Sequence, residues 1–312
     1  MAAQRARLSD GRWHFQHGPI DLLIGADGDP PAVALAHRLA WQRFWTVLQE
    51  LVAELAVLRQ PLPAEGALPA AEQLLRGPVA QRMWNACVPY RAGFITPMAA
   101  VAGAVAEELV ACYRRPGVRR AWINNGGDIA LHLIAGQALR IGLFADLGRL
   151  APALADALQD RRGLATDAQC EIRCDMPVRG VATSGWRGRS FSLGIADSVT
   201  VLAASAAGAD AAATVIANAV DVADPGIVRR PSCDIRDDSD LGAIPVTVAV
   251  PCLGEPLVRR ALAAGLARAE ALRAAGLIWS ATLVCQGRWC QTAVWAGPEL
   301  PPLTPALDAE CV

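Results

Sequence analysis

Residues 122–131, WINNGGDIAL, place two asparagines, two glycines and an aspartate between two short apolar runs. The runs predict two strands, 118–124 and 129–133, joined by the segment NNGGD. A Gly-Gly hairpin turn accounts for the glycines, and asparagine tolerates positive φ, which accounts for Asn125. The carboxylate of Asp128, at the start of an apolar strand, calls for a partner. Two interpretations stay open: an ordinary tight turn, or a loop that brings backbone and a carboxylate close to a ligand.

The segments around this stretch alternate between strand-like and helix-like patterns, which predicts a mixed α and β protein. A proline suits the first position of a helix, and Pro-Gly pairs end one. The helix that begins at Pro97 has almost nothing larger than valine over 99–106. Small residues let a helix approach another backbone or a ligand closely, and the spacing favours tight helix packing. The predicted elements are two strands within 12–28 joined at 17–19, helices over 30–58, 70–84 and 97–115, and a strand over 139–144.

Length, composition and charge limit the class of protein. The chain has 312 residues, of which 53% are hydrophobic, so it can bury a large core as one domain over residues 1–312, either single or built from two intertwined lobes. The net charge of -1 and the mixed signs of charge predict no nucleic-acid or membrane partner. No apolar run reaches the ~18 residues that span a bilayer, and the first residues lack a signal-peptide pattern. We therefore expect a cytoplasmic protein; self-association is left open.

The nine cysteines are expected to be free thiols, because their number is odd and the location is predicted to be reducing. The close pairs 170/174 and 285/290 lack the two-residue spacing of a zinc knuckle or a redox motif. The acidic run 233–242, CDIRDDSDLG, is typical of a solvated loop or helix start, with a second metal site as the alternative.

A second informative stretch, 179–203, contains two hydroxyls and a glycine after an apolar pair. Thr183, Ser184 and Gly185 offer hydroxyls and a flexible backbone, which are natural phosphate ligands. Arg187 and Arg189 add positive charge. Ser-Gly turns are also common without any ligand, so both interpretations stay open for this segment.

A third stretch, 204–220, places polar side chains on one face of an otherwise apolar helix. Asp210 and Thr214 stand four residues apart, so their side chains share one face, and Asn218 continues that face. Carboxylate and hydroxyl oxygens suit magnesium or calcium. The alternative is that Asp210 caps or salt-bridges while Thr214 bonds its own backbone.

Together the three stretches resemble the ApbE-like superfamily, whose best-known members are FAD:protein FMN transferases. The motifs stand in the superfamily's order and spacing, most clearly over 96–220. The remainder is similar to an uncharacterised branch of the same superfamily. The motifs that carry the resemblance are Asn125-Gly126-Gly127-Asp128, Ala182-Thr183-Ser184-Gly185, Ser198-Val199-Thr200-Val201 and Ala209-Asp210-Ala211-Ala212-Ala213-Thr214.

The resemblance implies an α+β fold, with mixed sheets and packed helices around a central cleft that holds FAD with Mg²⁺ at its pyrophosphate. Asp210, Thr214 and the carbonyl of Val101 would then be metal ligands. The turn from Asn125 through Gly126 and Gly127 to Asp128, and the turn from Thr183 through Ser184 to Gly185 with Arg187, would contact a phosphorylated small-molecule ligand. Magnesium would neutralise phosphate charge while an acceptor hydroxyl attacks.

The chain also departs from the transferases. Their His-x-x-Asp-Pro-x-Thr-Gly segment, between the TSG turn and the next strand, has no counterpart here between Gly185 and Ser198, and Ala102 stands where they carry a lysine. These differences favour a divergent protein that binds a flavin or other phosphorylated ligand with a divalent metal and is not a typical FMN transferase. A noncatalytic accessory protein of sulfur or thiol metabolism and a genuine FMN transferase remain as alternatives, so whether the protein is an enzyme is left open.

Overall fold

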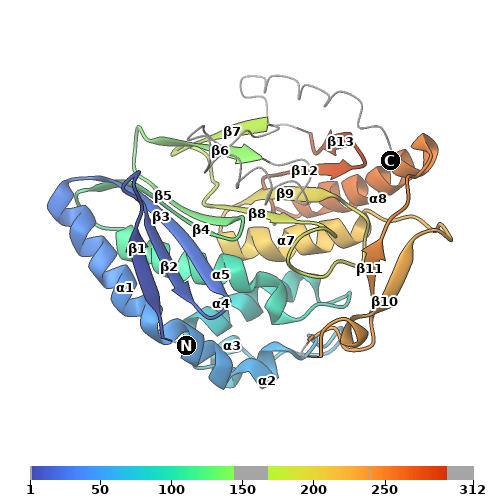
Figure 1. The fold of residues 1–312 in the computed structure, drawn as a ribbon, viewed down its shortest axis with the longest axis horizontal. Coiled ribbons are helices and arrows are strands. Elements are labelled where there is room, and N and C mark those ends of the chain that lie inside the picture. Colours follow the sequence, from blue (N-terminus) through green and yellow to red (C-terminus); the bar gives the residue numbers. More distant parts are fainter. Residues whose placement is uncertain (1, 144–167, 238, 294–312) are drawn as a thin grey trace. The chain divides into compact units, whose positions relative to one another are not determined.

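The computed structural model describes residues 2–143, 168–237 and 239–293 (Figure 1). Contacts divide the chain into two compact units: unit 1 comprises 1–138, 173–182 and 202–211, and unit 2 comprises 139–172, 183–201 and 212–312. Both units combine helices with antiparallel strands, so the predicted α+β class is confirmed. The single-domain organisation stays a prediction.

Unit 1 is built on an antiparallel sheet whose strands follow the order β1-β2-β3-β4-β5-β8. The apolar residues of its central strands alternate with more exposed ones, as expected when one face of a sheet is buried. The predicted pair of strands joined at 17–19 is therefore confirmed. The strands are β1 (Gln4–Arg7), β2 (Trp13–His17), β3 (Ile20–Gly28), β4 (Val118–Asn125), β5 (Asp128–Leu133) and the start of β8 (Gly180–Ser184).

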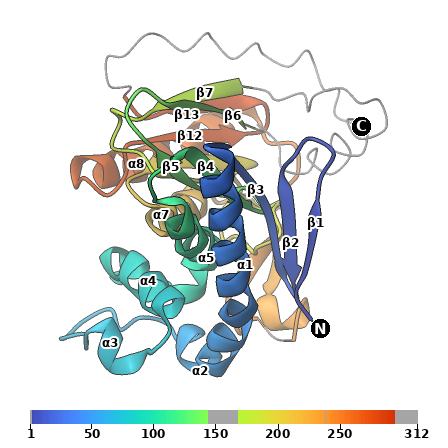
Figure 2. The ribbon, with the colours of Figure 1, turned by 90° about the vertical axis from the view of Figure 1, so that its left-hand side faces the viewer.

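Helices α1 and α5 pack on this sheet, with α1 against β2 and β3 and α5 against β4 and β5 (Figure 2). Helix α4 contacts both α1 and α5. The helical segments of unit 1 are α1 (Pro30–Ala53), α2 (Leu55–Leu58), α3 (Ala71–Leu74), α4 (Pro78–Cys87) and α5 (Val101–Val110), with 3-10 turns η1 (Val88–Tyr90), η2 (Pro97–Ala100) and η3 (Ala111–Tyr113).

Three predicted helices have different bounds from those expected. The 30–58 helix is interrupted at Glu54, and the 70–84 helix is two helices, separated before Gly77-Pro78 because proline lacks the N–H that a helix interior requires. The helix expected from Pro97 begins with a 3-10 turn and becomes α-helical only at Val101. Sequence patterning thus found the helical segments but missed their breaks.

The NNGGD segment is a tight hairpin in which Asn125 and Asp128 are paired residues of β4 and β5. The turn therefore contains only Gly126 and Gly127, whose φ values of 66° and 116° lie in the region that glycine adopts without strain. The N–H of Gly127 donates to the Asn124 side chain over 2.8 Å. The predicted strands are confirmed, and each is one residue longer at the turn than expected.

Unit 2 contains the rest of β8, which is followed in sheet order by β9, β12 and β13. Helix α8 packs on β12 and β13, and β10 pairs with β11 as a separate ribbon. The predicted strand over 139–144 is β6 to within a residue, with Phe144 outside the described residues. The elements are β6 (Ala138–Leu143), β7 (Ala168–Arg173), β9 (Ser198–Ala203), α7 (Ala206–Ala219), β10 (Val228–Pro231), η5 (Ser232–Asp234), β11 (Pro245–Ala249), α8 (Glu255–Ala274), β12 (Ser280–Cys285) and β13 (Arg288–Gln291); β6, β7, β8, β9 and α7 contribute residues to both units.

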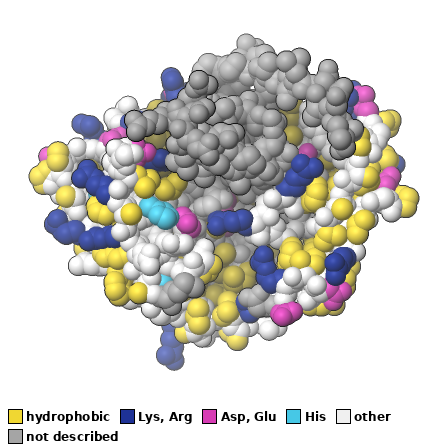
Figure 3. All heavy atoms as spheres, in the orientation of Figure 1, with side chains coloured by type: hydrophobic (Ala, Val, Ile, Leu, Met, Phe, Trp, Pro, Cys, Tyr) yellow, Lys and Arg dark blue, Asp and Glu magenta, His cyan; other side chains and the backbone are white. Residues whose placement is uncertain are grey.

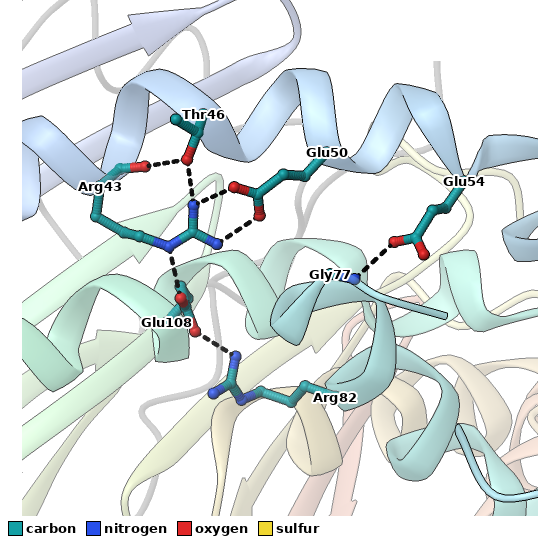
Figure 4. Close-up of polar contacts among 7 residues, drawn as sticks. All are labelled: Arg43, Thr46, Glu50, Glu54, Gly77, Arg82 and Glu108. Carbon is teal, nitrogen blue, oxygen red and sulfur yellow. Dashed lines mark hydrogen bonds and ion pairs between the residues drawn. The ribbon is translucent and has the colours of Figure 1, made fainter. Parts of the chain in front are cut away.

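A chain of ion pairs joins the three large helices of unit 1 (Figure 4). Arg43 of α1 donates to Glu108 of α5 over 2.7 Å and to Glu50 over 2.7–2.8 Å. Arg82 of α4 donates to the other oxygen of Glu108 over 3.0 Å. These side chains are mostly buried, so breaking one pair leaves a partly desolvated charge and costs more than a surface pair would.

Charged side chains of both signs lie on the described surface (Figure 3). On the face drawn in Figure 3, arginine and acidic side chains are interspersed. Within 2–143, 168–237 and 239–293, no helix combines the length and the apolar character needed to cross a bilayer. The expected free thiols are confirmed at Cys87, Cys112, Cys170, Cys174, Cys233, Cys285 and Cys290, whereas Cys311 lies outside the described residues.

Gly103 of α5 lies in close contact with the start of α7. A Cβ atom at this position would lie 2.3 Å from the carbonyl oxygen of Ala206 and 2.9 Å from the backbone nitrogen of Ala207. Both atoms belong to the backbone at the start of α7, so neither can rotate away. Within the small residues of 99–106, helix packing therefore explains the glycine at position 103.

We predict that Gly103→Ala lowers the free energy of unfolding by about 3 kcal/mol, because the added methyl group forces α5 and α7 apart. Urea denaturation followed by circular dichroism measures this change. Gly93→Ala is the control, since its Cβ would meet only the Tyr90 carbonyl at 3.8 Å. Equal stability of Gly103→Ala and wild type would contradict the close approach.

Candidate functional site

The carboxyl group of Asp210, in the second turn of α7, meets the N-terminus of α5. The N–H of Gly103 donates to Oδ2 of Asp210 over 2.9 Å, and the N–H of Ala102 also hydrogen-bonds to this carboxyl group. No side chain of its own caps α5, so Asp210 serves two of the N–H groups that a helix start leaves without partners. The alternative that Asp210 caps a helix is therefore correct for its Oδ2 atom.

A second carboxyl group, that of Asp128, lies close enough to Asp210 to affect its ionisation. Burial is the largest cause that raises the pKa of Asp210 well above its usual range, and the charge of Asp128 raises it further. The N–H groups of Gly103 and Ala102 oppose this shift without cancelling it. Asp128 itself is 9% exposed. Two neighbouring carboxyl groups in poorly hydrated surroundings resist being charged together, and a proton or a cation relieves the repulsion.

The hairpin turn is tied to the same helix start. The Asn125 side chain, which is buried, donates to the carbonyl of Ala102 over 3.1 Å. Asp128 follows two glycines later, opposite Asn125 in the hairpin. The NNGGD segment is thus an ordinary tight turn that also brings a carboxylate to Asp210. The two interpretations raised by the sequence do not exclude each other.

Two further residues predicted as metal ligands lie on the same two helices as this contact. Val101 is the first residue of α5, directly before Ala102 and Gly103. Thr214 follows Asp210 by one turn of α7, although Asp210 belongs to unit 1 and Thr214 to unit 2. Asn218, one turn further, accepts hydrogen bonds from Ser192 and from the N–H of Leu193, so its side chain holds a loop of unit 2.

The TSG segment and Arg187 belong to unit 2 and have protein partners there. The hydroxyl of Thr183 is 3.0 Å from that of Thr200 on β9. A Cβ on Gly185 would lie 2.4 Å from the carbonyl oxygen of Asp197, so the chain's own backbone requires this glycine. Arg187 stacks on Trp186 at 4.9 Å and lies 4.0 Å from Asp197. Packing against the backbone of Asp197 thus explains Gly185. Ser184 is half-buried and follows Thr183 at the end of β8.

The described residues of the acidic run 233–242 belong to no recognisable metal centre. The part of the chain that is described has no cluster of three or more histidine, cysteine, aspartate or glutamate side chains able to hold a metal ion. Cys233 is exposed, and Asp234 closes the short turn η5. The solvated-loop interpretation fits these residues, with Asp238 outside the described residues.

Glu107, which we did not predict as a site residue, lies beside the Asp210 contact. Its carboxylate accepts a hydrogen bond from the N–H of Ala207, at the start of α7, over 3.2 Å. Arg82 lies 3.3 Å from its other oxygen. The signal was present in the sequence, because Glu107 and Glu108 are an acidic pair in a helix that is otherwise apolar up to residue 110.

Comparison with known proteins finds relatives among archaeal proteins. The protein named UPF0280 of Methanospirillum hungatei is 35% identical over 160 residues, which cover 51% of this chain and 56% of that protein. The UPF0280 protein of Methanothrix thermoacetophila is 33% identical over 181 residues, 56% of this chain and 64% of that protein. The chain thus spans about half the length of the curated relatives it matches.

Two solved structures align over most of the chain at low similarity. The apo flavinyl transferase ApbE of Pseudomonas stutzeri is 14% identical, with 94% of this chain and 93% of that chain covered and a TM-score of 0.41. The ApbE protein of Thermotoga maritima is 11% identical, with 93% and 96% covered and the same TM-score of 0.41.

A family model covers far more of the sequence than the two UPF0280 proteins described above do. The model described as "AbpE bacteria" matches residues 5–291, which include the NNGGD hairpin, the TSG segment and the helix that carries Asp210. The chain therefore belongs to this family of ApbE-like proteins.

Proposed function

We propose that this protein binds a phosphorylated small molecule, with a flavin such as FAD as the leading candidate, through a divalent cation held at Asp210. Thr214 and the carbonyl of Val101 supply further oxygen ligands. Asn125, Gly126, Gly127 and Asp128, together with Thr183, Ser184, Gly185 and Arg187, contact the ligand in this proposal. The cytoplasmic location expected from the sequence is part of it.

The observation that carries the proposal is the pair of carboxyl groups, Asp128 and Asp210, beside the start of α5. Burial and mutual repulsion disfavour the charged form of Asp210, and a divalent cation would remove that penalty. Magnesium is usually held by one or two carboxylates together with substrate phosphates, and seldom by a cage made of protein alone. The lack of a three-residue acidic or histidine cluster in the described part of the chain is consistent with that kind of site.

The donors at this site fit magnesium by chemistry. Asp210 offers a carboxylate, Thr214 a hydroxyl and Val101 a carbonyl, and hard oxygen donors of this kind are the ligands that magnesium prefers. When bound, the cation would neutralise phosphate charge and polarise a phosphorus–oxygen bond. The protein's own contribution is to hold Asp210 through the N–H groups of Ala102 and Gly103.

The segment that follows the TSG turn supports a divergent role over FMN transfer. It is short and folds back on itself: the N–H of Trp186 donates to the carbonyl of Ala196 over 3.0 Å. Its acid, Asp197, is 6% exposed and accepts hydrogen bonds from the Trp186 ring over 3.3 Å and from the N–H of Gln286. Acceptor attack needs a base and a shaped acceptor site, and this segment supplies neither a histidine nor an unengaged carboxylate.

One observation favours the alternative of a noncatalytic protein that keeps the fold alone. Asp210 already caps α5, a structural use that would preserve this residue without any cation. A genuine FMN transferase is the remaining alternative. Calorimetry and an activity assay separate the three proposals.

We predict that wild type binds FAD more tightly with magnesium than without it, and that Asp210→Ala weakens magnesium-dependent binding by about 100-fold or more. Isothermal titration calorimetry with FAD, with and without magnesium chloride, measures both affinities. Asp175→Ala, at an exposed acid of the same unit, is the control and should bind as wild type does. Equal magnesium-dependent affinity in Asp210→Ala would show that Asp210 holds no cation.

We predict that the protein transfers FMN to an acceptor threonine at least ~100-fold more slowly than a known flavinyl transferase, because the segment after Gly185 provides no general base. The assay incubates each protein with FAD, magnesium and an acceptor domain, followed by flavin fluorescence in a denaturing gel. A bright acceptor band at the rate of the positive control would establish the genuine-transferase alternative.

We predict that Asp210→Asn is more stable than wild type at neutral pH in magnesium-free buffer, by on the order of 1 kcal/mol. The pKa of Asp210 is raised on folding, so its contribution to stability is complete below the unfolded value near 3.8 and is lost as the pH rises through the folded value. Asparagine keeps an acceptor for Gly103 and does not ionise. Urea denaturation between pH 4 and 8 should show a difference that grows with pH; a constant difference would contradict the shift.

A further inference from the structure

Helices α5 and α7 cap each other through one acid from each. Asp210 of α7 accepts from the N–H of Gly103, in the first turn of α5, over 2.9 Å. Glu107 of α5 accepts from the N–H of Ala207, in the first turn of α7, over 3.2 Å. We call this pair of hydrogen bonds the reciprocal cap. All four of its residues belong to unit 1.

The Glu107 half of the reciprocal cap is held from outside by arginines. Arg82 lies 3.3 Å from Oε1 of Glu107 and 3.0 Å from Oε2 of Glu108, while Arg43 donates to Glu108 over 2.7 Å. The Glu107 side chain is 19% exposed and that of Glu108 is 13% exposed. Glu107 is therefore a fixed acceptor with its second oxygen occupied.

The position of Asp210 depends on where α7 begins. Asp210 follows Ala207 by three positions, about 4.5 Å along a helix, so a displacement of Ala207 also displaces Asp210 by nearly the same amount. Gly103 contacts the Ala206 carbonyl directly, and no side chain lies between the two backbones there. Ser205 supplies the remaining cap of α7 by accepting from the N–H of Gly208 over 3.1 Å. Ser205 directly precedes α7 in the chain, so its hydrogen bond does not connect α7 to α5. Of the two side chains that cap the start of α7, Glu107 is the one that belongs to α5.

We propose that Glu107, held by Arg82, is a positioning residue for Asp210. It fixes the start of α7, and the Asp210 carboxylate therefore meets the α5 amides in one orientation. The Asp210 oxygen that binds the cation is then held in one place. The inference rests on the proposed function for its effect on cation binding. Its structural half, the effect on the Gly103 hydrogen bond, stands without that function. Residues that orient a metal ligand commonly change metal affinity by about 10–100-fold when removed.

Glu108 provides a matched control on the same helix. It is the neighbouring acid, it shares Arg82 with Glu107, and its two oxygens accept from Arg43 and Arg82. If the acids matter only because they neutralise arginines, Glu107→Ala and Glu108→Ala should have similar effects at Asp210. If Glu107 positions α7, only Glu107→Ala should change the position of the Asp210 carboxyl group. Glu107→Gln retains an oxygen acceptor for Ala207 and should restore the wild-type behaviour.

The first measurement is the amide resonance of Gly103 in protein labelled with ¹⁵N-glycine, because this N–H donates to Asp210. In Glu107→Ala the resonance should shift and its hydrogen exchange should accelerate by about tenfold or more, while Glu108→Ala and Glu107→Gln keep both near wild type. Should Glu107→Ala fail to fold, Glu107→Asp, whose shorter side chain falls short of Ala207, carries the same expectation. An unchanged Gly103 amide, or equal changes in the Glu107 and Glu108 variants, would overturn the positioning role.

The second measurement is the magnesium concentration that gives half-maximal FAD binding. We expect it to rise about 10–100-fold in Glu107→Ala and to stay within about twofold of wild type in Glu107→Gln and Glu108→Ala. A purely structural role would reduce the amount of folded protein without moving this midpoint, and that result would overturn the effect on cation binding. If wild type binds FAD without any need for magnesium, the proposed function fails, and the Gly103 amide alone then decides the positioning role.

Discussion

The contact of backbone with backbone between Gly103 and Ala206 is the constraint on which the rest of unit 1 depends. Any side chain at residue 103 would keep α5 and α7 apart, and the two acids could then no longer reach the opposite helix starts. The hairpin turn attaches to the same point, because Asn125 donates to the carbonyl of Ala102. The packing of α5 on α7, the hairpin turn and the pair of carboxyl groups therefore all depend on the position of the start of α5.

Burial of charge is the energetic cost of this arrangement. A carboxyl group in the position of Asp210 is held by helix amides, which favour its charged form, and is opposed by poor hydration and by Asp128. Helix amides alone do not compensate for both. An apolar residue would pack there without that penalty. In the function that we propose, the charge of a bound cation removes the penalty.

Sequence analysis predicted the elements well where the pattern is local. The NNGGD hairpin, the α7 helix and the mixture of helices and strands follow from periodicity and from glycine chemistry, which act over a few residues, whereas the α+β class followed from the resemblance to the ApbE-like superfamily. The breaks near Glu54 and Gly77 were missed, since apolar spacing continues across them. Polar side chains within apolar segments drew attention to Asp128 and Asp210. The groups that hold Asp210 were not predicted, because a backbone N–H leaves no mark in a sequence. The acidic pair at Glu107 and Glu108 is visible in the sequence, but the contact of Glu107 lies in a helix 100 positions away.

That separation also affects how the chain folds. The two hydrogen bonds of the reciprocal cap close loops of 107 and 100 residues, whereas the β4–β5 hairpin closes one of two residues. Loop closure costs entropy before a contact contributes energy, so long-range contacts form slowly compared with hairpins. We expect Asn125 and Asp128 to be in place early and Asp210 to arrive late. Until it does, only half of the site that we propose for a phosphorylated ligand is formed.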